Sequence, residues 1–274
     1  MIGSLYADAK SLVKRNKRLT WLYVKTKLLI MRRLNLYTRA GNSQSDENEI
    51  LNNLLLAHTN IPKTFVEFGF SGWEFNCNDL CNGNSWKGFL IDADPYNINI
   101  AQARFGNSIE SKQAWITKDN IKNLVETWLG RSRSLGVLSI DVDGNDYWLL
   151  KELIHLNAAI VIMEYNSAFG HNKVSAIYDK SFDRTRKHDR WTYYGVSLSM
   201  VTHFLSDHGY TLTAISSNGV NAFYLRNDFV CHSDKTLDPI IDFKDSFTIR
   251  DLPSWENEWE YIKDLEYEWG EFKR

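Results

Sequence analysis

TLTAISSNGVNAFYL, residues 211–225, decides the fold. Two runs with strand character, 211–215 and 220–225, flank Asn218-Gly219, and this dipeptide strongly favours a tight hairpin turn. Earlier in the chain, helix-length stretches separate short β-rich runs at 64–68, 88–92, 113–116, 136–141 and 158–164. Such spacing predicts βαβ units and a parallel sheet. We therefore expect an α/β fold whose mainly parallel seven-stranded sheet is closed by an antiparallel hairpin.

Composition describes an ordinary globular protein, because the 274 residues are 43% hydrophobic and 24% charged. Three cysteines cannot form a disulfide framework, and the sequence shows no secretory signal pattern. The apolar runs of residues 19–36, near the N-terminus, are too short and too charged to cross a bilayer. The predicted compartment is the cytoplasm.

Charge is concentrated at the two ends of the chain. Residues 1–40 carry ten basic residues against one acid, a net charge of +9, while residues 242–274 carry ten acids against five bases, a net charge of −5. We predict a basic amphipathic arm (1–40), a central domain (41–228) and an acidic, Trp-rich tail (229–274). The arm is expected to pack on the core, to join a second copy in a homo-oligomer, or to contact a membrane surface. The tail is expected to dock on the domain or on another subunit.

The first strand ends in VEFGFSG, residues 66–72, where glycines would let the backbone approach a ligand. Asp92 ends the second strand 25 positions after Glu67. An acid at that place can accept hydrogen bonds from both hydroxyls of a ribose. Asp94 competes for this role, although capping the helix after Pro95 suits it better.

A dense cluster of acids follows the fourth strand in SIDVDGNDYW, residues 139–148. Three neighbouring carboxylates are unfavourable unless a cation or a ligand amine compensates them. The fifth strand delivers further oxygen donors to the same sheet edge, and an all-oxygen set suits Mg²⁺, Mn²⁺ or Ca²⁺. The predicted metal ligands are Asp141, Asp143, Glu164 and Asn166. Alternatively, Asp143 and Asn145 only shape a turn while Asp146 caps the next helix.

Six motifs carry a resemblance to a known family over roughly residues 62–228: VEFGxxG, GFLIDADP, SIDVDGNDYW, VIMEYN, YYGVSL and GVNAFYLR. In this order they resemble the FkbM-type S-adenosylmethionine-dependent methyltransferases. The resemblance implies a Rossmann-like class I methyltransferase fold, S-adenosylmethionine as cofactor, and a sugar hydroxyl of a glycan or glycolipid as acceptor, in polysaccharide biosynthesis. It also implies a set of cofactor-binding residues, namely Glu67, Gly69, Gly72, Asp92, Trp115 and Asp141.

Methyl transfer to oxygen requires an aligned acceptor and a group that takes its proton. A divalent metal would lower the pKa of the hydroxyl. Without a metal, a side-chain base is needed, and Asp143 and His171 are the predicted catalytic residues; the alternative for His171 is a solvated loop position.

The long segment 167–191 is expected to form a substrate lid, and its basic run RTRKHDR, residues 184–190, either meets a phosphate or acidic sugar or is solvated. Two other functions stay open: methylation of another small molecule, and a non-catalytic scaffold that binds partners through arm and tail. Nucleic acid is not an expected partner, since the densest basic charge lies far in sequence from the site.

Overall fold

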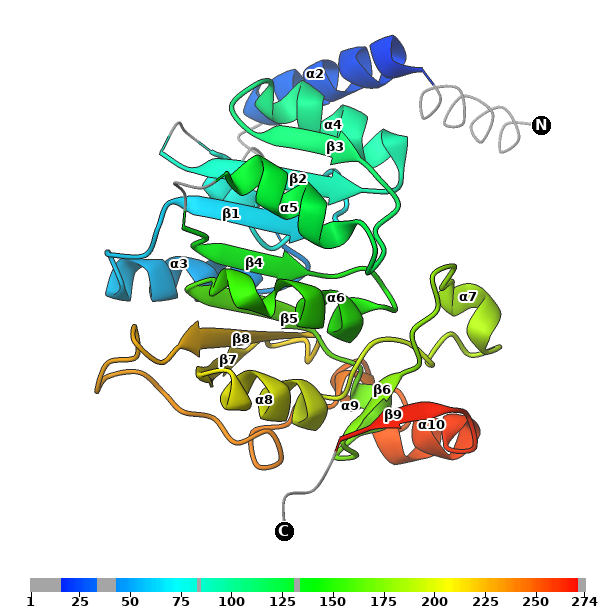
Figure 1. The fold of residues 1–274 in the computed structure, drawn as a ribbon. Helices are drawn as coiled ribbons and strands as arrows, with labels where there is room; N and C mark the ends of the chain where they lie inside the picture. Colours follow the sequence, from blue (N-terminus) through cyan, green and yellow to red (C-terminus); the bar gives the residue numbers. More distant parts are fainter. Residues whose placement is uncertain (1–15, 34–42, 83–84, 131–133, 271–274) are drawn as a thin grey trace, which may run out of the picture.

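A seven-stranded sheet forms the centre of the computed structural model, which describes residues 16–33, 43–82, 85–130 and 134–270 (Figure 1). Its strands are β1 (Thr64–Phe68), β2 (Lys87–Asp92), β3 (Glu110–Gln113), β4 (Val137–Ile140), β5 (Ile160–Glu164), β7 (Tyr210–Ile215) and β8 (Asn221–Arg226). Their order is β3-β2-β1-β4-β5-β8-β7, with β1 to β5 parallel and β8 antiparallel to both β5 and β7. The predicted sheet and closing hairpin are confirmed, whereas the third strand begins three residues earlier than expected.

Side chains of the strands alternate between two hydrophobic cores. In β5, for example, Ile160 and Ile162 point into one core while Val161 and Met163 point into the other. This alternation follows from the two-residue repeat of a strand, and it explains why β1, β4 and β5 are buried along their whole length. The sheet is therefore buried on both faces.

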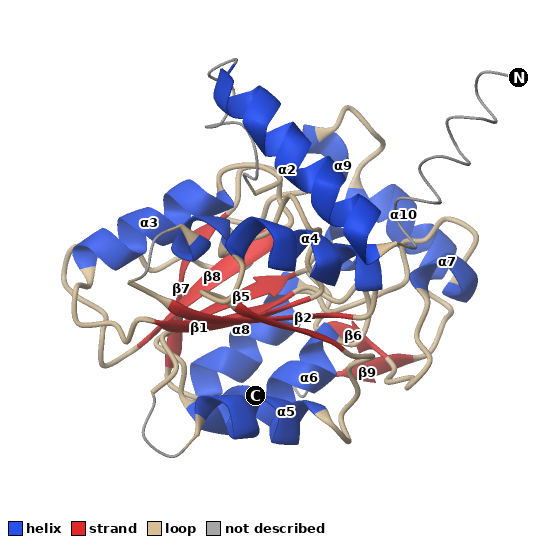
Figure 2. Ribbon diagram, turned by 90° about the horizontal axis from the view of Figure 1, so that it is seen from above, coloured by secondary structure: helices blue, strands red, loops and turns tan. Residues whose placement is uncertain are grey.

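Helices cover both faces of this sheet, which gives a three-layer α/β/α arrangement (Figure 2). One face carries α3 (Glu47–Ala57), the 3-10 helix η2 (Asn78–Cys81) and α4 (Pro95–Phe105). The other carries α5 (Ile121–Leu129), α6 (Asp146–Leu153), the 3-10 helix η3 (Ile154–Leu156) and α8 (Leu198–Asp207).

Helix α2 (Lys17–Arg33) lies outside α4 as an added layer, where Val24 packs against Ile100 and Ala103. Much of the predicted arm, residues 1–15 and 34–40, lies outside the described residues. Within the described ranges, no helix combines the length and hydropathy needed to cross a bilayer.

A second, two-stranded sheet joins the segment after β5 to the C-terminal tail, and the sequence analysis did not predict it. It pairs β6 (Val174–Ala176) with β9 (Tyr267–Trp269) in antiparallel fashion. Around it lie η4 (Ser167–Phe169), α7 (Arg184–Lys187), α9 (Ser246–Ile249) and α10 (Trp255–Ile262). Aromatic rings of both segments interlock, since the Phe169 and Tyr267 ring centroids are 5.4 Å apart. The tail thus packs on the domain of its own chain.

Candidate functional site

A cleft of about 720 Å³ opens at the carboxyl ends of the parallel strands. Four acids reach it from strand ends: Glu67 of β1, Asp92 of β2, Asp141 directly after β4 and Glu164 of β5. Segments beyond β5 form the opposite wall, including Tyr194 and the α9 residues Ser246 and Phe247. Parallel strands end at one sheet edge, so residues scattered along the sequence converge here.

The turn after β1 brings the backbone against the end of β4. Gly69 has a φ of +68°, and a Cβ built there would lie 1.5 Å from the carbonyl oxygen of Asp141. Only glycine therefore fits this position. Gly72, predicted to bind a cofactor, does not line the cleft; instead it packs against Ile100 of α4.

Glu67 lies at the floor of the cleft and is almost fully buried. Its Oε1 accepts a hydrogen bond from the backbone N–H of Asn76 and its Oε2 one from that of Cys77, both at 2.8 Å. Burial raises the pKa of this carboxyl to about 7 although the two hydrogen bonds act in the opposite direction. Glu67 therefore shapes the loop beyond the first turn, because each of its oxygens already has a donor from the chain.

Asp92 and Asp94 divide the two roles expected at the end of β2. Asp92 lines the cleft, and its Oδ1 accepts from the backbone N–H of Asp94 at 2.6 Å; burial raises its pKa. The side chain of Asp94 accepts from the N–H of Tyr96 at 2.8 Å and caps α4. Of the two acids, Asp92 is thus the one that lines the cleft, and Asp94 caps the helix.

Trp115 lines the cleft from the loop after β3, not from the strand itself as predicted. Its indole Nε1 donates to the carbonyl oxygen of Lys180 at 2.8 Å, and the side chain is 55% exposed. The hydrogen bond fixes the ring plane while leaving much of the ring accessible. This placement suits stacking against a flat ligand group.

Three predicted metal ligands converge at the centre of the cleft. One carboxylate oxygen from each of Asp141, Asp143 and Glu164 lies within 4.8 Å of the others. Burial, followed by the charges of the neighbouring carboxylates, raises the pKa values of Asp141 and Glu164 well above their ordinary range. Glu164 Oε1 accepts from the hydroxyl of Tyr194 at 3.3 Å, while buried Oε2 has no hydrogen-bond partner among the described residues. This donor set fits a divalent cation, because it offers only oxygen and one acceptor is unsatisfied.

Arg184 supplies a positive charge to this carboxylate cluster. Its guanidinium contacts Asp143 and lies 4.0 Å from the ring centroid of Tyr194. Arg184 begins α7, whose N-terminus is capped by Asp183. The first basic residue of the run 184–190 therefore points into the cleft, and a metal ion would compete with it for Asp143.

Asp146 and Asn145 hold the loop that presents Asp143. The two oxygens of buried Asp146 accept from the N–H groups of Val142 at 2.7 Å and Gly144 at 2.8 Å, and burial raises its pKa to about 6. Asn145 donates from Nδ2 to the carbonyl oxygen of Asp179 at 2.8 Å. The predicted helix cap at Asp146 is wrong, because Asn145 is the N-cap residue of α6 and the Asp146 carboxylate binds the preceding loop. Asp143 does shape the turn, with a φ of +56°, and its carboxylate also joins the cluster.

Asn166 and His171 do not occupy their predicted roles. Asn166 Oδ1 accepts from the N–H of Ala168 at 2.9 Å, and its Nδ2 donates to the carbonyl oxygens of Thr192 and Tyr194 at 2.7 and 2.9 Å. Its amide is committed to the backbone and is not turned toward a metal. The ring of His171 lies outside the cleft, packed 4.9 Å from Phe243 and 5.4 Å from Trp255.

Several cleft residues escaped the sequence analysis. Tyr194 belongs to the quoted motif YYGVSL, so a signal for it existed. Arg250, Ser246 and Phe247 come from the tail, outside every motif, and only the tertiary structure brings them to the cleft.

The chain matches no family model and no curated protein. The N-terminal domain of EvdMO1 with SAH bound is similar at 12% identity, over 67% of this chain and 80% of that one, with a TM-score of 0.41. A putative caffeoyl-CoA O-methyltransferase from Staphylococcus aureus is similar at 12% identity, over 73% of this chain and 91% of that one, with a TM-score of 0.45. A methyltransferase from Geobacter sulfurreducens is similar at 15% identity, over 82% of this chain and 96% of that one, with a TM-score of 0.41. These TM-scores lie below 0.5. The fold is therefore assigned from the strand order of the sheet, and the function is argued from the geometry of the cleft.

Proposed function

We propose that this protein is an S-adenosylmethionine-dependent O-methyltransferase. The observation that carries the proposal is that Asp92 and the turn at Gly69 line the cleft together, at the ends of neighbouring strands. A carboxylate after the second strand, beside a glycine turn after the first, is the arrangement that recognises an adenosine ribose. The resemblance to FkbM-type methyltransferases supports the same function.

In this proposal, Asp92 accepts hydrogen bonds from both ribose hydroxyls, Trp115 lies against the adenine, and Asp141 faces the cofactor amine. The acceptor hydroxyl then approaches from the side of Tyr194 and Arg184. Asp143, an exposed carboxylate of the cluster, is placed to receive the hydroxyl proton, with buried Glu164 beside it. When bound, Mg²⁺ or Mn²⁺ would be held by Asp141, Asp143 and Glu164 and would lower the pKa of the hydroxyl.

We propose an anionic acceptor, a sugar hydroxyl in a glycan or glycolipid that carries a carboxylate or phosphate. Three arginines line the acceptor side of the cleft, namely Arg184, Arg190 and Arg250. Arg184 pairs with Asp143 and Arg190 with Glu258, while Arg250 is exposed. Arginine binds carboxylate and phosphate groups through its planar fork of donors. Methylation of another small anionic molecule is the alternative within this proposal.

Isothermal titration with S-adenosylmethionine tests the cofactor site. Asp92→Ala is expected to weaken binding by about 2 kcal/mol, roughly 30-fold, since it removes charge-assisted hydrogen bonds. Asp94→Asn is the matched control: it removes a charge two residues away yet keeps the helix cap, so binding should not change. Absence of binding to the unaltered protein, with and without Mg²⁺, would favour the non-catalytic scaffold instead.

We also propose that α2 contacts an anionic membrane surface. The helix contains six basic residues and no acid. Leu22 and Leu29, seven positions apart, are 58% and 66% exposed. An apolar helix face among basic residues suits the headgroup region of a bilayer that carries negative charge.

Co-sedimentation with vesicles tests this contact. The full chain is expected to bind vesicles that contain phosphatidylglycerol and not pure phosphatidylcholine vesicles. The double variant Leu22→Glu/Leu29→Glu should lose the binding, whereas Leu56→Glu, at a 76% exposed position on α3, should retain it. Equal binding by both variants would contradict the assignment to α2.

A further inference from the structure

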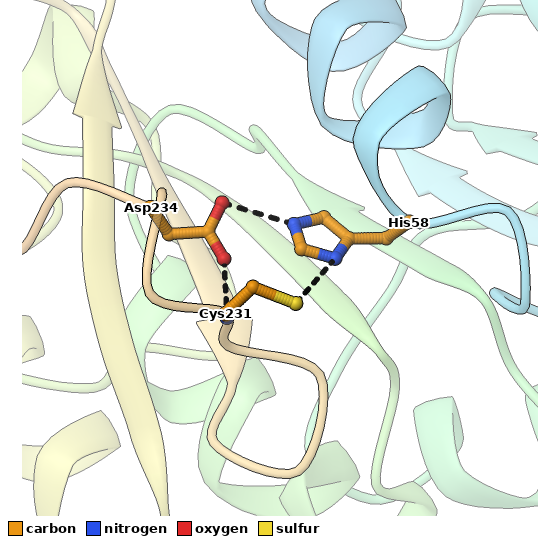
Figure 3. Close-up of side chains that lie close together, drawn as sticks. All are labelled: His58, Cys231 and Asp234. Carbon is orange, nitrogen blue, oxygen red and sulfur yellow. Dashed lines mark hydrogen bonds and ion pairs between the residues drawn. The ribbon is translucent and has the colours of Figure 1, made fainter.

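A cysteine, a histidine and an aspartate meet at the sheet edge opposite the cleft (Figure 3). His58 directly follows α3 as its C-cap residue, shortly before β1 begins, and Cys231 and Asp234 follow β8. Leu225 near the end of β8 pairs with Ile160, the first residue of β5, which places this cluster at the amino ends of the parallel strands. None of the three side chains lines the cleft.

The three side chains form a chain of contacts through the imidazole. His58 Nδ1 lies 4.0 Å from Cys231 Sγ, at the outer limit of a hydrogen bond to sulfur, and His58 Nε2 lies 3.0 Å from Asp234 Oδ1; the thiol also contacts the carbonyl oxygen of Phe229 at 3.5 Å. Asp234 Oδ2 accepts from the backbone N–H of Cys231 at 2.6 Å, which fixes the carboxylate relative to the thiol. A nucleophile, a base and a group that orients the base are thus arranged in series.

Two features would stabilise the proton that His58 accepts from the thiol. The carboxylate of Asp234 stabilises an imidazolium directly. His58 is also the C-cap residue of the 11-residue helix α3, and a helix C-terminus favours a positive charge. Because His58 is buried while Cys231 is exposed, the base is held in place and the sulfur stays accessible.

The other two cysteines provide a contrast within the same chain. Cys77 and Cys81 are buried, and burial raises the pKa values of both thiols well above the ordinary range. Nucleophilic reactions of cysteine require the thiolate and access to it. Cys231 is the exposed one of the three cysteines and has a base within reach.

We propose that Cys231, His58 and Asp234 form a reactive-thiol site that exchanges with low-molecular-weight disulfides. His58 takes the proton of the Cys231 thiol, and Asp234 holds the resulting imidazolium. The thiolate attacks one sulfur of the disulfide, so that a bond forms from Cys231 Sγ to that sulfur and the original S–S bond breaks. The leaving thiolate takes the proton from His58. The product is a mixed disulfide at Cys231 and one free small thiol.

A single metal ion is the competing interpretation of these three side chains. Cys231 and Asp234 face different nitrogens of the imidazole, as the two dashed contacts to the ring in Figure 3 show. One nitrogen of the ring, the Cys231 sulfur and an oxygen of Asp234 nevertheless lie within 4.8 Å of one another, close enough to share one ion. The contacts through both ring nitrogens are those of a proton-transfer chain, and the zinc content of the purified protein separates the two interpretations.

Alkylation of the full-length protein by iodoacetamide, followed by peptide mapping, tests the proposal. At pH 7, Cys231 in the folded protein is expected to react about tenfold faster than Cys231 in the same protein unfolded in guanidinium, since an unfolded thiol is mostly protonated. Cys77 and Cys81 should react more slowly in the folded protein than after unfolding. Incubation with glutathione disulfide should place one glutathionyl group on Cys231.

Variants assign this reactivity to the cluster. His58→Gln and Asp234→Asn should each lower the folded-state rate about tenfold. Asp228→Asn is the matched control. Asp228 lies three residues before Cys231 and pairs with Arg226, and its replacement should not change the alkylation rate of Cys231. Circular dichroism verifies folding, and Asp234→Asn suffices if His58→Gln does not fold. An unchanged rate in a folded variant, or one equivalent of Zn²⁺ retained by the purified protein, would overturn the proposal.

Discussion

At the scale of single residues, Gly69 occupies a position where the backbone accommodates glycine and no other residue. Its φ of +68° disfavours any side chain, and an added Cβ would lie 1.5 Å from the carbonyl oxygen of Asp141. We expect Gly69→Ala to lower the free energy of unfolding by about 3 kcal/mol, because the backbone of β4 must move. Gly106→Ala is the control, since its φ is +64° and nothing lies within 4 Å; it should cost about 1 kcal/mol. Urea unfolding of both variants measures the difference.

Glu67 makes stability depend on pH. Its pKa is about 7 in the folded state, above the ordinary value of 4.5, so the folded protein binds the proton more tightly than the unfolded chain. Its contribution to stability is therefore complete below about pH 4 and is lost as the pH rises through 7. Between pH 5 and 8, the unfolding free energy of the natural protein should fall by about 2.5 kcal/mol more than that of Glu67→Gln. Equal pH slopes for the two proteins would contradict this.

Sequence reasoning placed correctly the residues that lie at strand ends. The carboxylates of Asp92, Asp141 and Glu164 reach the cleft because parallel strands terminate at a common edge. It failed for His171 and Asn166, which lie on the irregular segment after β5. Their side chains are directed by packing with the tail and by loop carbonyls, and no periodic pattern encodes such contacts.

At the scale of elements, Asn166 anchors the segment that carries Tyr194. Asn166→Ala removes one acceptor and two donors and leaves the carbonyl oxygens of Thr192 and Tyr194 without this partner. We expect a loss of about 3 kcal/mol in unfolding free energy and faster amide exchange across 192–196. Asn172→Ala, which removes a hydrogen bond to Phe169 within one turn, should cost about 1 kcal/mol and leave that exchange unchanged. Hydrogen exchange with mass spectrometry distinguishes the two.

Long, apolar elements were predictable and short ones were not. The predicted strands at 64–68, 88–92 and 136–141 match β1, β2 and β4 within one residue at each end. The polar strand β3 (ESKQ) offered no alternation and was placed late. Strands β6 and β9 are three residues each and pair across more than 90 positions, so nothing local in the sequence marks them.

At the scale of the whole molecule, an ion pair ties the tail to the rim of the cleft. Arg190 donates from Nε to Glu258 Oε2 at 2.8 Å, and the Glu258 carboxylate is buried in α10. Glu258→Gln should lower unfolding free energy by about 1.5 kcal/mol, because the arginine is partly solvated, and should speed proteolysis of the tail. Glu260→Gln, which removes an exposed pair with Lys263, should leave both unchanged. Limited proteolysis compares the two variants.

Strand β8, deep in the sheet although late in the chain, has a consequence for synthesis on the ribosome. Strand β5 gains its second neighbour only when residues 221–226 have emerged, because β8 lies between β5 and β7. Until then, a nascent chain exposes an apolar, hydrogen-bonding edge of a kind that pairs readily with other chains. Chain termination upstream of Asn221 should therefore yield aggregating fragments, and a holding chaperone should engage the nascent protein during that interval.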